Sequence, residues 1–430
     1  MEQTAADRAF TVPLAFGMAV SMWAVAYVCR LPVVMAPAWL VFALLLVAVA
    51  WWGAAAGRWT ARGWLAGARV GFGAAVLNLL ILGSFLTSAE SGRLTPSALI
   101  WVPGSILAVA GVAAVAAAVG SRDSAAGGGR NWTAIFAKVA MIATFLMVIA
   151  GGLVTSFEAG LAVTDWPNTF GSNMFLYPLS RMTGGIYYEH AHRLFGTLVG
   201  LTTIGLAVRL WRFDGRAWLK RLAVLAVVLV IVQGVLGGLR VTGSFTLSTS
   251  EADMAPSIAL AVLHGVLGQV FLGLMVLIAV AASSWWADAP APMPSGSVAT
   301  DRRLQVALIA VLVVQLVLGA IQRHMAQGLI VHISLATVVV VMAIAAGARA
   351  WGLYNGGRPV DHLGRWLMTV VALQVALGIA ALAATQGRAV VGSPTTLEVT
   401  IATAHQATGA FLLALSVALA AWTRRLYRPE

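Results

Sequence analysis

The sequence has little charge, a single cysteine and, in its first 121 residues, no histidine. Charged residues make up only 10% of its 430 residues, whereas hydrophobic residues make up 60%. A soluble domain carries roughly 25% charged residues. This chain therefore lacks the polar surface of a water-soluble globule, and its solvent must be lipid. The single cysteine, Cys29, excludes an intramolecular disulfide and a cysteine metal cluster.

Twelve apolar runs are each long enough to form a bilayer-spanning helix, which needs about 20 residues. The net charge of +12 does not indicate nucleic acid, because the basic residues lie in short clusters between these runs, as membrane topology requires. The lipid bilayer is therefore a predicted partner, and nucleic acid is not. The runs lie at about 11–31, 34–53, 68–88, 97–120, 134–155, 190–211, 219–240, 255–283, 304–322, 326–349, 364–385 and 396–422.

Lysine and arginine in the loops predict the orientation, because cytoplasmic loops carry an excess of both. If the N-terminus is cytoplasmic, 20 of the 27 lysine and arginine residues fall on the cytoplasmic side and 7 on the opposite side. The sequence thus predicts a multi-pass protein of the cell inner (plasma) membrane with both termini cytoplasmic.

A glycine-rich stretch at 122–133 divides the chain, as is typical of a flexible linker. Before it, residues 1–121 hold four predicted helices, to which the sequence assigns no role. After it come eight predicted helices and all seven histidines, in the units 134–283 and 304–425. We predict an all-α polytopic membrane protein, in which a tandem pair of four-helix bundles follows four extra helices.

Four histidines inside the apolar runs show an internal repeat. His192 and His264 are 72 residues apart, and His332 and His405 are 73 apart. The second pair follows the first by 140 and 141 residues, so a four-helix unit is used twice in the same orientation. A Gln-x-x-Leu-Gly pattern occurs at 233–237, 315–319 and 374–378, and in two of these copies it lies 31 residues before the second histidine of a pair.

Paired histidines at matched spacing favour heme. A single membrane histidine can simply hydrogen-bond a neighbouring helix, although intramembrane ionisable residues are usually functional. Two imidazoles that face each other in a dry bundle suit heme iron. Zinc fits poorly, because each pair lacks a third ligand, and a proton relay would not need the same spacing twice. We therefore predict four heme-iron ligands, which are His192 and His264 in one site and His332 and His405 in the other.

The two predicted sites differ in ionisable residues. Glu189 lies one turn before His192 and Arg193 directly follows it, whereas Leu329 and Ile333 occupy the matching positions in the second unit. In low dielectric, a carboxylate beside a heme can move protons or stabilise a cation, and an arginine can pair with a heme propionate. The alternatives are a helix cap for Glu189 and an interfacial, snorkelling Arg193.

The loops before the two sites differ as well. About residues 156–188 precede the first site, and only a few residues, around 322–327, precede the second. A long loop over one site suggests a gated pocket. The difference favours one reactive heme and one permanent heme.

Residues 134–425 resemble the heme A synthase family. The resemblance rests on Gly-Gly-Leu-Val-Thr at 151–155, Gly-Leu-Ala-Val at 160–163, Asp-Trp-Pro at 165–167, Glu189-x-x-His192-Arg193, Leu-Gly-Ala at 318–320 with Arg323 and His324, and the four histidines. It implies an enzyme that oxidises the C8 methyl group of heme O to a formyl group through a hydroxymethyl intermediate. The product, heme A, supplies cytochrome oxidase.

The resemblance also implies roles for individual residues. His192 and His264 would hold the substrate, heme O, near the catalytic Glu189, and His332 and His405 would hold heme b as the resident cofactor. Ile333 stands where a basic residue would anchor a propionate, so Arg323 is the predicted substitute at that heme rim. The cysteine pair that some members carry in the outer loop is missing.

The implied partners are heme O synthase, as supplier of heme O, and a quinol or other membrane electron donor. The oligomeric state stays open, a homo-oligomer included. Two other functions fit the same histidines. One is a diheme b-type protein that passes electrons between quinol and an outer partner, and the other is a non-redox transporter or assembly factor. A pure electron carrier needs no carboxylate in one half, so the difference between Glu189 and Leu329 favours the enzyme.

Overall fold

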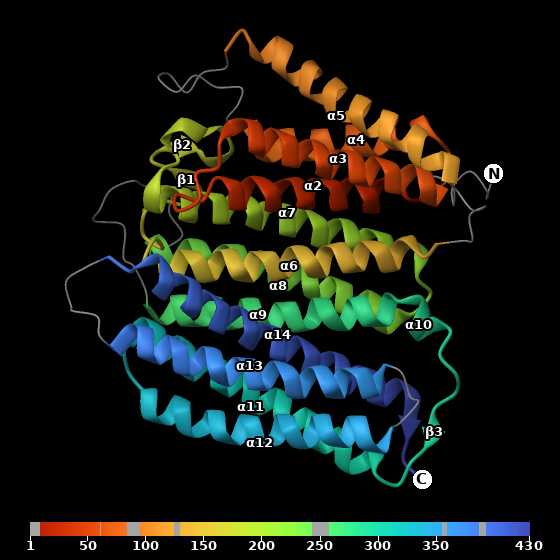
Figure 1. Cartoon of the computed structure of the whole chain (residues 1–430), viewed down its shortest axis with the longest axis vertical. Coiled ribbons are helices and arrows are strands. Elements are labelled where there is room, and N and C mark those ends of the chain that lie inside the picture. The colour runs from red at the N-terminus through yellow and green to blue at the C-terminus, as the bar shows by residue number, and fades with distance from the viewer. Residues whose placement is uncertain are drawn as a thin grey trace. The chain divides into compact units, whose positions relative to one another are not determined.

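The computed structural model describes residues 9–60, 62–83, 95–123, 130–242, 258–354, 359–386 and 393–430. Within these ranges, twelve helices are long and apolar enough to cross a membrane (Figure 1). The predicted class, an all-α polytopic membrane protein, is confirmed. Residues 124–129, the glycine-rich part of the predicted linker, lie outside the described ranges.

The long helices follow the predicted apolar runs. They are α2 (Thr11–Cys29), α3 (Ala38–Thr60), α4 (Trp64–Ile81), α5 (Ala98–Gly120), α6 (Trp132–Ser156), α7 (Gly184–Phe213), α8 (Ala217–Thr242), α9 (Ile258–Ala282), α11 (Val298–Met325), α12 (Leu329–Leu353), α13 (Val360–Gln386) and α14 (Thr396–Leu426). The short elements are α10 (Ser284–Ala287), the 3-10 turns η2 (Ser121–Asp123), η3 (Met174–Leu176) and η4 (Leu179–Arg181), the antiparallel pair β1 (Asn168–Thr169) and β2 (Ser172–Asn173), and the parallel pair β3 (Met293–Pro294) and β4 (Tyr427–Arg428).

The start of α7 differs from its predicted position. The helix begins at Gly184, whereas hydropathy placed its start near residue 190. The extra turns contain Tyr187, Glu189 and His190, which are polar or amphipathic but buried, each at 5% exposure or less. Because polar partners and aromatic packing satisfy these side chains, the helix extends through residues that hydropathy alone assigns to a loop.

By its contacts, the chain forms two compact units. The first contains α2–α5, the first half of α6 and α7, and the second contains the end of α6, α8, α9 and α11–α14. The predicted domain boundaries after residues 121, 133 and 283 stay predictions, as does the tandem relation of two bundles.

In the first unit, α3, α4 and α5 approach each other through small residues. A Cβ atom added to Gly53 or Gly67 would collide with the backbone of Ala113, and one added to Gly57 with the backbone of Ala117. Glycines spaced by four residues on one helix thus meet alanines spaced by four on another. This spacing lets backbones pack closely, which is a main source of helix association in lipid.

Helix α2 packs along α7 in the same unit. Trp23 stacks on Phe195 with ring centres 6.3 Å apart and planes 10° apart. The hydroxyl of Tyr187 donates a hydrogen bond of 2.8 Å to the carbonyl oxygen of Tyr27. The N-terminal region therefore supports the helix that carries Glu189.

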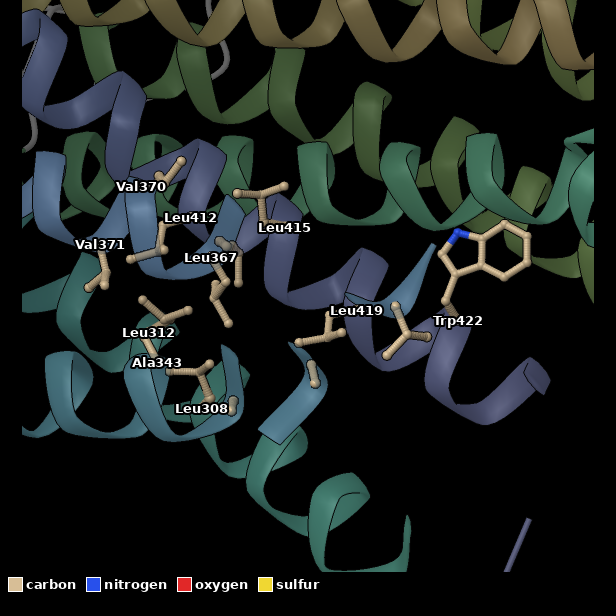
Figure 2. Packing of buried hydrophobic residues seen from close by; sticks show 14 of the residues in the cluster. Leu308, Leu312, Ala343, Leu367, Val370, Val371, Leu412, Leu415, Leu419 and Trp422 are labelled. Atoms are coloured by element: carbon tan, nitrogen blue, oxygen red, sulfur yellow. The ribbon is translucent and has the colours of Figure 1, made fainter. Parts of the chain in front are cut away.

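In the second unit, α11–α14 form a bundle in which each helix packs on the next and α14 packs on α11. Buried aliphatic side chains from all four helices build its core, among them Leu312 of α11, Ala343 of α12, Leu367 of α13 and Leu419 of α14 (Figure 2). Burial of such side chains contributes roughly 1.5–3 kcal/mol each in water, but in lipid the same side chains contribute mainly through close packing. The bundle fixes the mutual position of α12 and α14.

Candidate functional site

His332 of α12 and His405 of α14 face each other in the second unit. Their ring centres are 6.5 Å apart and their planes are 79° apart. A metal–imidazole bond is about 2 Å long and the nitrogen lies about 1 Å from the ring centre, so two rings on opposite sides of one metal ion stand about 6 Å apart. The structure thus brings this predicted pair together at the spacing of two axial ligands.

The donor set of this pair fits heme. Nδ1 of His405 is buried without a hydrogen-bond partner, a costly state unless something binds the ring. Among the described residues, no cluster of three or more His, Cys, Asp or Glu side chains could hold a metal ion. Heme iron needs only two axial ligands from the protein, which is the number that this pair supplies.

The preceding helix supplies a seat for each ring. A Cβ atom added to Gly319 would lie 3.1 Å from Cε1 of His332, and one added to Gly378 would lie 3.0 Å from Cε1 of His405. Any side chain at either glycine would therefore press on the imidazole. Nε2 of Gln315 donates to the carbonyl oxygen of His332 at 2.9 Å and lies 3.1 Å from Nδ1 of the ring.

The same arrangement recurs at His264. A Cβ atom added to Gly237 would lie 3.3 Å from Cε1 of His264, and Nε2 of Gln233 donates to the His264 carbonyl oxygen at 3.2 Å. We call a glutamine and a glycine four residues apart, packed on a histidine of the next helix, a Gln–Gly seat. The Gln-x-x-Leu-Gly pattern found in the sequence is this seat.

The glycines that follow two of the histidines have another neighbour than the sequence suggested. Gly268 and Gly409 were expected to leave room for a helix or a flat ligand beside the ring. Cβ atoms added there would instead lie 3.6 Å from Nε2 of Gln233 and 3.2 Å from Nε2 of Gln374, respectively. Both glycines thus make room for the glutamine of the seat.

The other predicted pair divides between the units. His192 lies on α7 in the first unit, and His264 lies on α9 in the second. Both side chains project from membrane-spanning helices, as predicted. Their assignment as partners on one heme stays a prediction.

Glu189 and Arg193 form a buried ion pair on α7. Nε of Arg193 lies 3.1 Å from Oε1 of Glu189, and the side chains are only 8% and 6% exposed. Because α7 begins at Gly184 after the N-cap residue Thr183, Glu189 lies beyond the first turn and does not cap the helix. A charge pair buried to this degree persists only when further hydrogen bonds satisfy it.

The loop before α7 provides those hydrogen bonds. The Arg193 guanidinium donates to the carbonyl oxygens of Val163 at 2.8 Å, Asp165 at 2.6 Å and Asn168 at 3.1 Å. With the bond to Glu189, four of its five N–H groups are used. Arg193 therefore anchors the loop, and its predicted pairing with a heme propionate stays a prediction.

His190 is a second anchor that sequence reasoning missed. Its ring is fully buried, with Nδ1 3.0 Å from Oγ1 of Thr169 and the ring centre 5.1 Å from that of Tyr177. Residues two apart on a helix point to different sides, so His190 faces the loop while His192 does not share its face. The paired histidines in Glu-His-Ala-His were the available signal.

Arg323 lies in the last turn of α11. Its Nη2 donates to the carbonyl oxygen of Thr155 at 2.6 Å, near the end of α6 in the same unit. This bond ties the two helix ends together. The predicted role of Arg323 at the rim of heme b stays a prediction.

Comparison with known proteins assigns this part of the chain. The model of the cytochrome oxidase assembly protein family, to which heme A synthases belong, matches residues 134–334. A heme A synthase of Halalkalibacterium halodurans is 30% identical over 146 residues, which are 34% of this chain and 44% of that protein. A heme A synthase of Lysinibacillus sphaericus is 33% identical over 113 residues, or 26% and 34% of the two chains.

A third relative carries another name. The protoheme IX farnesyltransferase of Haloarcula marismortui is 29% identical over 145 residues, which are 34% of this chain and 28% of that protein. The matches to all three relatives span less than half of the relatives' own lengths. Through residues 134–334, the chain belongs to the heme A synthase family, as the sequence motifs predicted.

Proposed function

We propose that this member of the heme A synthase family is a membrane oxidoreductase that converts heme O to heme A for cytochrome oxidase. The reaction would oxidise the C8 methyl group of heme O to a formyl group. The observation that carries the proposal is the facing pair of His332 and His405, with ring centres 6.5 Å apart, in a chain whose residues 134–334 match this family.

His332 and His405 would hold heme b as the resident cofactor. A heme with two imidazole ligands supplies one-electron transfer. The Gln–Gly seats hold the two rings on fixed backbones, and Gly319 and Gly378 leave no space for the rings to move toward the preceding helix. Arg323, at the end of α11, is the basic group proposed for the rim of this heme.

His192 and His264 would hold heme O, with Glu189 as the catalytic group. Glu189 and His192 lie one turn apart on α7 and so share a face. The carboxylate would accept the proton released as the methyl group is oxidised, or stabilise the cation that develops there. Arg193 orients this carboxylate and holds residues 163–168 at the same end of α7, which would exclude water from the reaction.

The proposed partners and location follow from the substrate and the charge pattern. Heme O synthase would supply heme O, and the name of the Haloarcula relative belongs to that neighbouring step. A quinol or another membrane carrier would exchange electrons with heme b. The distribution of 20 and 7 basic residues supports the cell inner membrane with both termini cytoplasmic.

The test is heme extraction after co-expression of the full chain with a heme O supplier, followed by chromatography. We expect heme A from the wild type. Glu189→Gln should retain heme b but form about 10²-fold less heme A, because it removes one acid–base group while leaving all four histidines. Glu430→Gln, at the exposed C-terminal residue, is the matched control.

Each other result identifies a different function. Wild-type heme A yield from Glu189→Gln would remove the carboxylate from the chemistry. Heme b without any heme A in the wild type would favour the diheme electron carrier. Wild-type protein without heme would favour a transporter or assembly factor.

A further inference from the structure

An open groove of about 380 Å³ lies on the second unit, where α11 begins and α14 ends. Its apolar floor is one face of α11, and arginines stand at its end. The lining residues are Arg302, Arg303, Val306, Ala307, Ala310 and Arg424. None of them takes part in the proposed heme chemistry.

The arginines of the groove carry uncompensated positive charge. Arg303 and Arg424 are exposed, and no acidic side chain among the described residues lies within 4 Å of either guanidinium. Arg302 donates to the carbonyl oxygen of Tyr427 at 2.6 Å, while its Nε is buried without a partner. The neighbouring carboxylate, Asp301, binds Arg349 instead. Three positive charges therefore converge on one end of the groove.

The floor of the groove is apolar and exposed. Val306 is 45% exposed, and Ala307 and Ala310 lie on the same side of α11 within one turn. The two alanines leave a shallow channel along a helix that spans the membrane. A chain of methylene groups fits such a channel, whereas a free anion would contact only the arginines.

We propose that this groove binds an anionic phospholipid of the surrounding bilayer. The phosphate lies among Arg302, Arg303 and Arg424, whose planar guanidinium groups match phosphate oxygens. One acyl chain lies along the floor of α11. Basic pockets between membrane helices at the arginine-rich side bind anionic head groups in this way.

Binding would also stabilise the end of α14. Arg302 links the start of α11 to the carbonyl oxygen of Tyr427 in β4, directly after α14. A phosphate beside Arg302 would fix this guanidinium and, through it, the end of the helix that carries His405. Lipid binding should therefore raise the unfolding temperature of the full chain.

The experiment measures lipid retention by the detergent-purified full chain in native mass spectrometry. Dioleoylphosphatidylglycerol, which is anionic, is compared with dioleoylphosphatidylcholine, which is not. We expect the wild type to retain the anionic lipid preferentially. Arg303→Gln with Arg424→Gln should lower its retention at least fivefold, because each basic residue strengthens binding to anionic lipid about that much. Arg428→Gln, an exposed arginine of β4 outside the groove, should retain as much lipid as the wild type.

A second variant tests the acyl-chain channel. Ala310→Phe fills the floor without changing charge, and it should lower retention of the anionic lipid while leaving the arginines intact. Inorganic phosphate at millimolar concentration should not displace the lipid. Circular dichroism checks that the variants fold, and Arg303→Gln alone replaces the double variant if the latter is unfolded.

Three outcomes would overturn the proposal. They are equal retention of both lipids by the wild type, unchanged preference in the arginine variants, and displacement of the lipid by inorganic phosphate. The last would show a site for a free anion. None of these measurements depends on heme binding or heme A formation.

Discussion

Helices α2–α5 and helices α11–α14 are two groups of four apolar helices that use glycine in different ways. In α2–α5, glycines such as Gly57 face the backbone of a neighbouring helix. In α11–α14, Gly319 and Gly378 face the imidazoles of His332 and His405. The first arrangement brings helices together, and the second positions a ligand.

The comparison shows that glycine in a membrane helix reports a close approach but not its purpose. Glycine spaced by four residues favours helix association wherever it occurs. In the second group, a glutamine four residues before the glycine also contacts the carbonyl oxygen of the next helix, as Gln315 does with His332. The glutamine, together with a histidine in the following helix, separates a ligand seat from a simple packing contact.

The largest expected effect is the loss of heme b on removal of a ligand. His332→Ala or His405→Ala should lower heme b content of the purified full chain by at least about tenfold, because one of two axial bonds is lost. The low-spin b-type absorption spectrum measures this loss. His362→Ala, a half-exposed residue of α13 beside Asp361, is the control. Full heme b occupancy in both ligand variants would contradict the assignment.

A substitution in the first group should affect stability instead. Gly57→Ala forces α3 away from the Ala117 backbone of α5, and overpacking of this kind costs about 1–3 kcal/mol. The unfolding temperature should fall while heme b content stays unchanged. Gly111→Ala, on α5 with no atom within 4 Å of the added carbon, should cause no fall. Equal unfolding temperatures for the two variants would mean that the close approach is not needed.

The matching substitution in the second group should affect the ligand. Gly378→Ala places a methyl carbon about 3 Å from Cε1 of His405 and displaces the ring. Heme b affinity should fall about tenfold, the usual lower range for disturbing a group that orients a metal ligand. Gly352→Ala, near the end of α12 in open space, should bind heme b normally. A wild-type spectrum for Gly378→Ala would show that the ring tolerates the methyl group.

The smallest expected effect concerns alkaline pH. Burial, together with a hydrogen bond to Asp301, raises the pKa of Tyr354 to about 12, above its ordinary value of 10.0. The protonated phenol therefore contributes stability below pH 10, and this contribution is lost as the pH rises toward 12. Tyr354→Phe should reduce the fall in unfolding temperature between pH 9 and 11. An identical fall in wild type and variant would assign alkaline unfolding to other groups.

Hydropathy and histidine spacing predicted much of this molecule. The twelve helices follow the apolar runs because each must satisfy its own backbone in lipid. The facing of His332 and His405 followed from their spacing, since residues 73 apart span two helices of a bundle. The ion pair between Glu189 and Arg193 was also readable from its i,i+4 spacing, but attention to His192 obscured it.

Other features depend on contacts that no local pattern contains. The three loop carbonyl oxygens that bind Arg193 are polar groups of the backbone, so no side chain in the loop marks them. The role of the Gln-x-x-Leu-Gly pattern was hidden for the same reason, because its partner is a ring on the following helix. The small-residue spacing of Gly53 and Gly57 was a readable packing signal that hydropathy does not use.

The Gln–Gly seat is complete within two consecutive helices. Hairpins α8–α9, α11–α12 and α13–α14 each pair a seat glycine on the first helix with a histidine on the second. The smallest heritable module of ligand placement is therefore the hairpin rather than the four-helix unit. A hairpin copied intact by gene duplication, or grafted into a designed membrane bundle, would bring an oriented imidazole with it, and the new scaffold would need to supply only the opposite ligand.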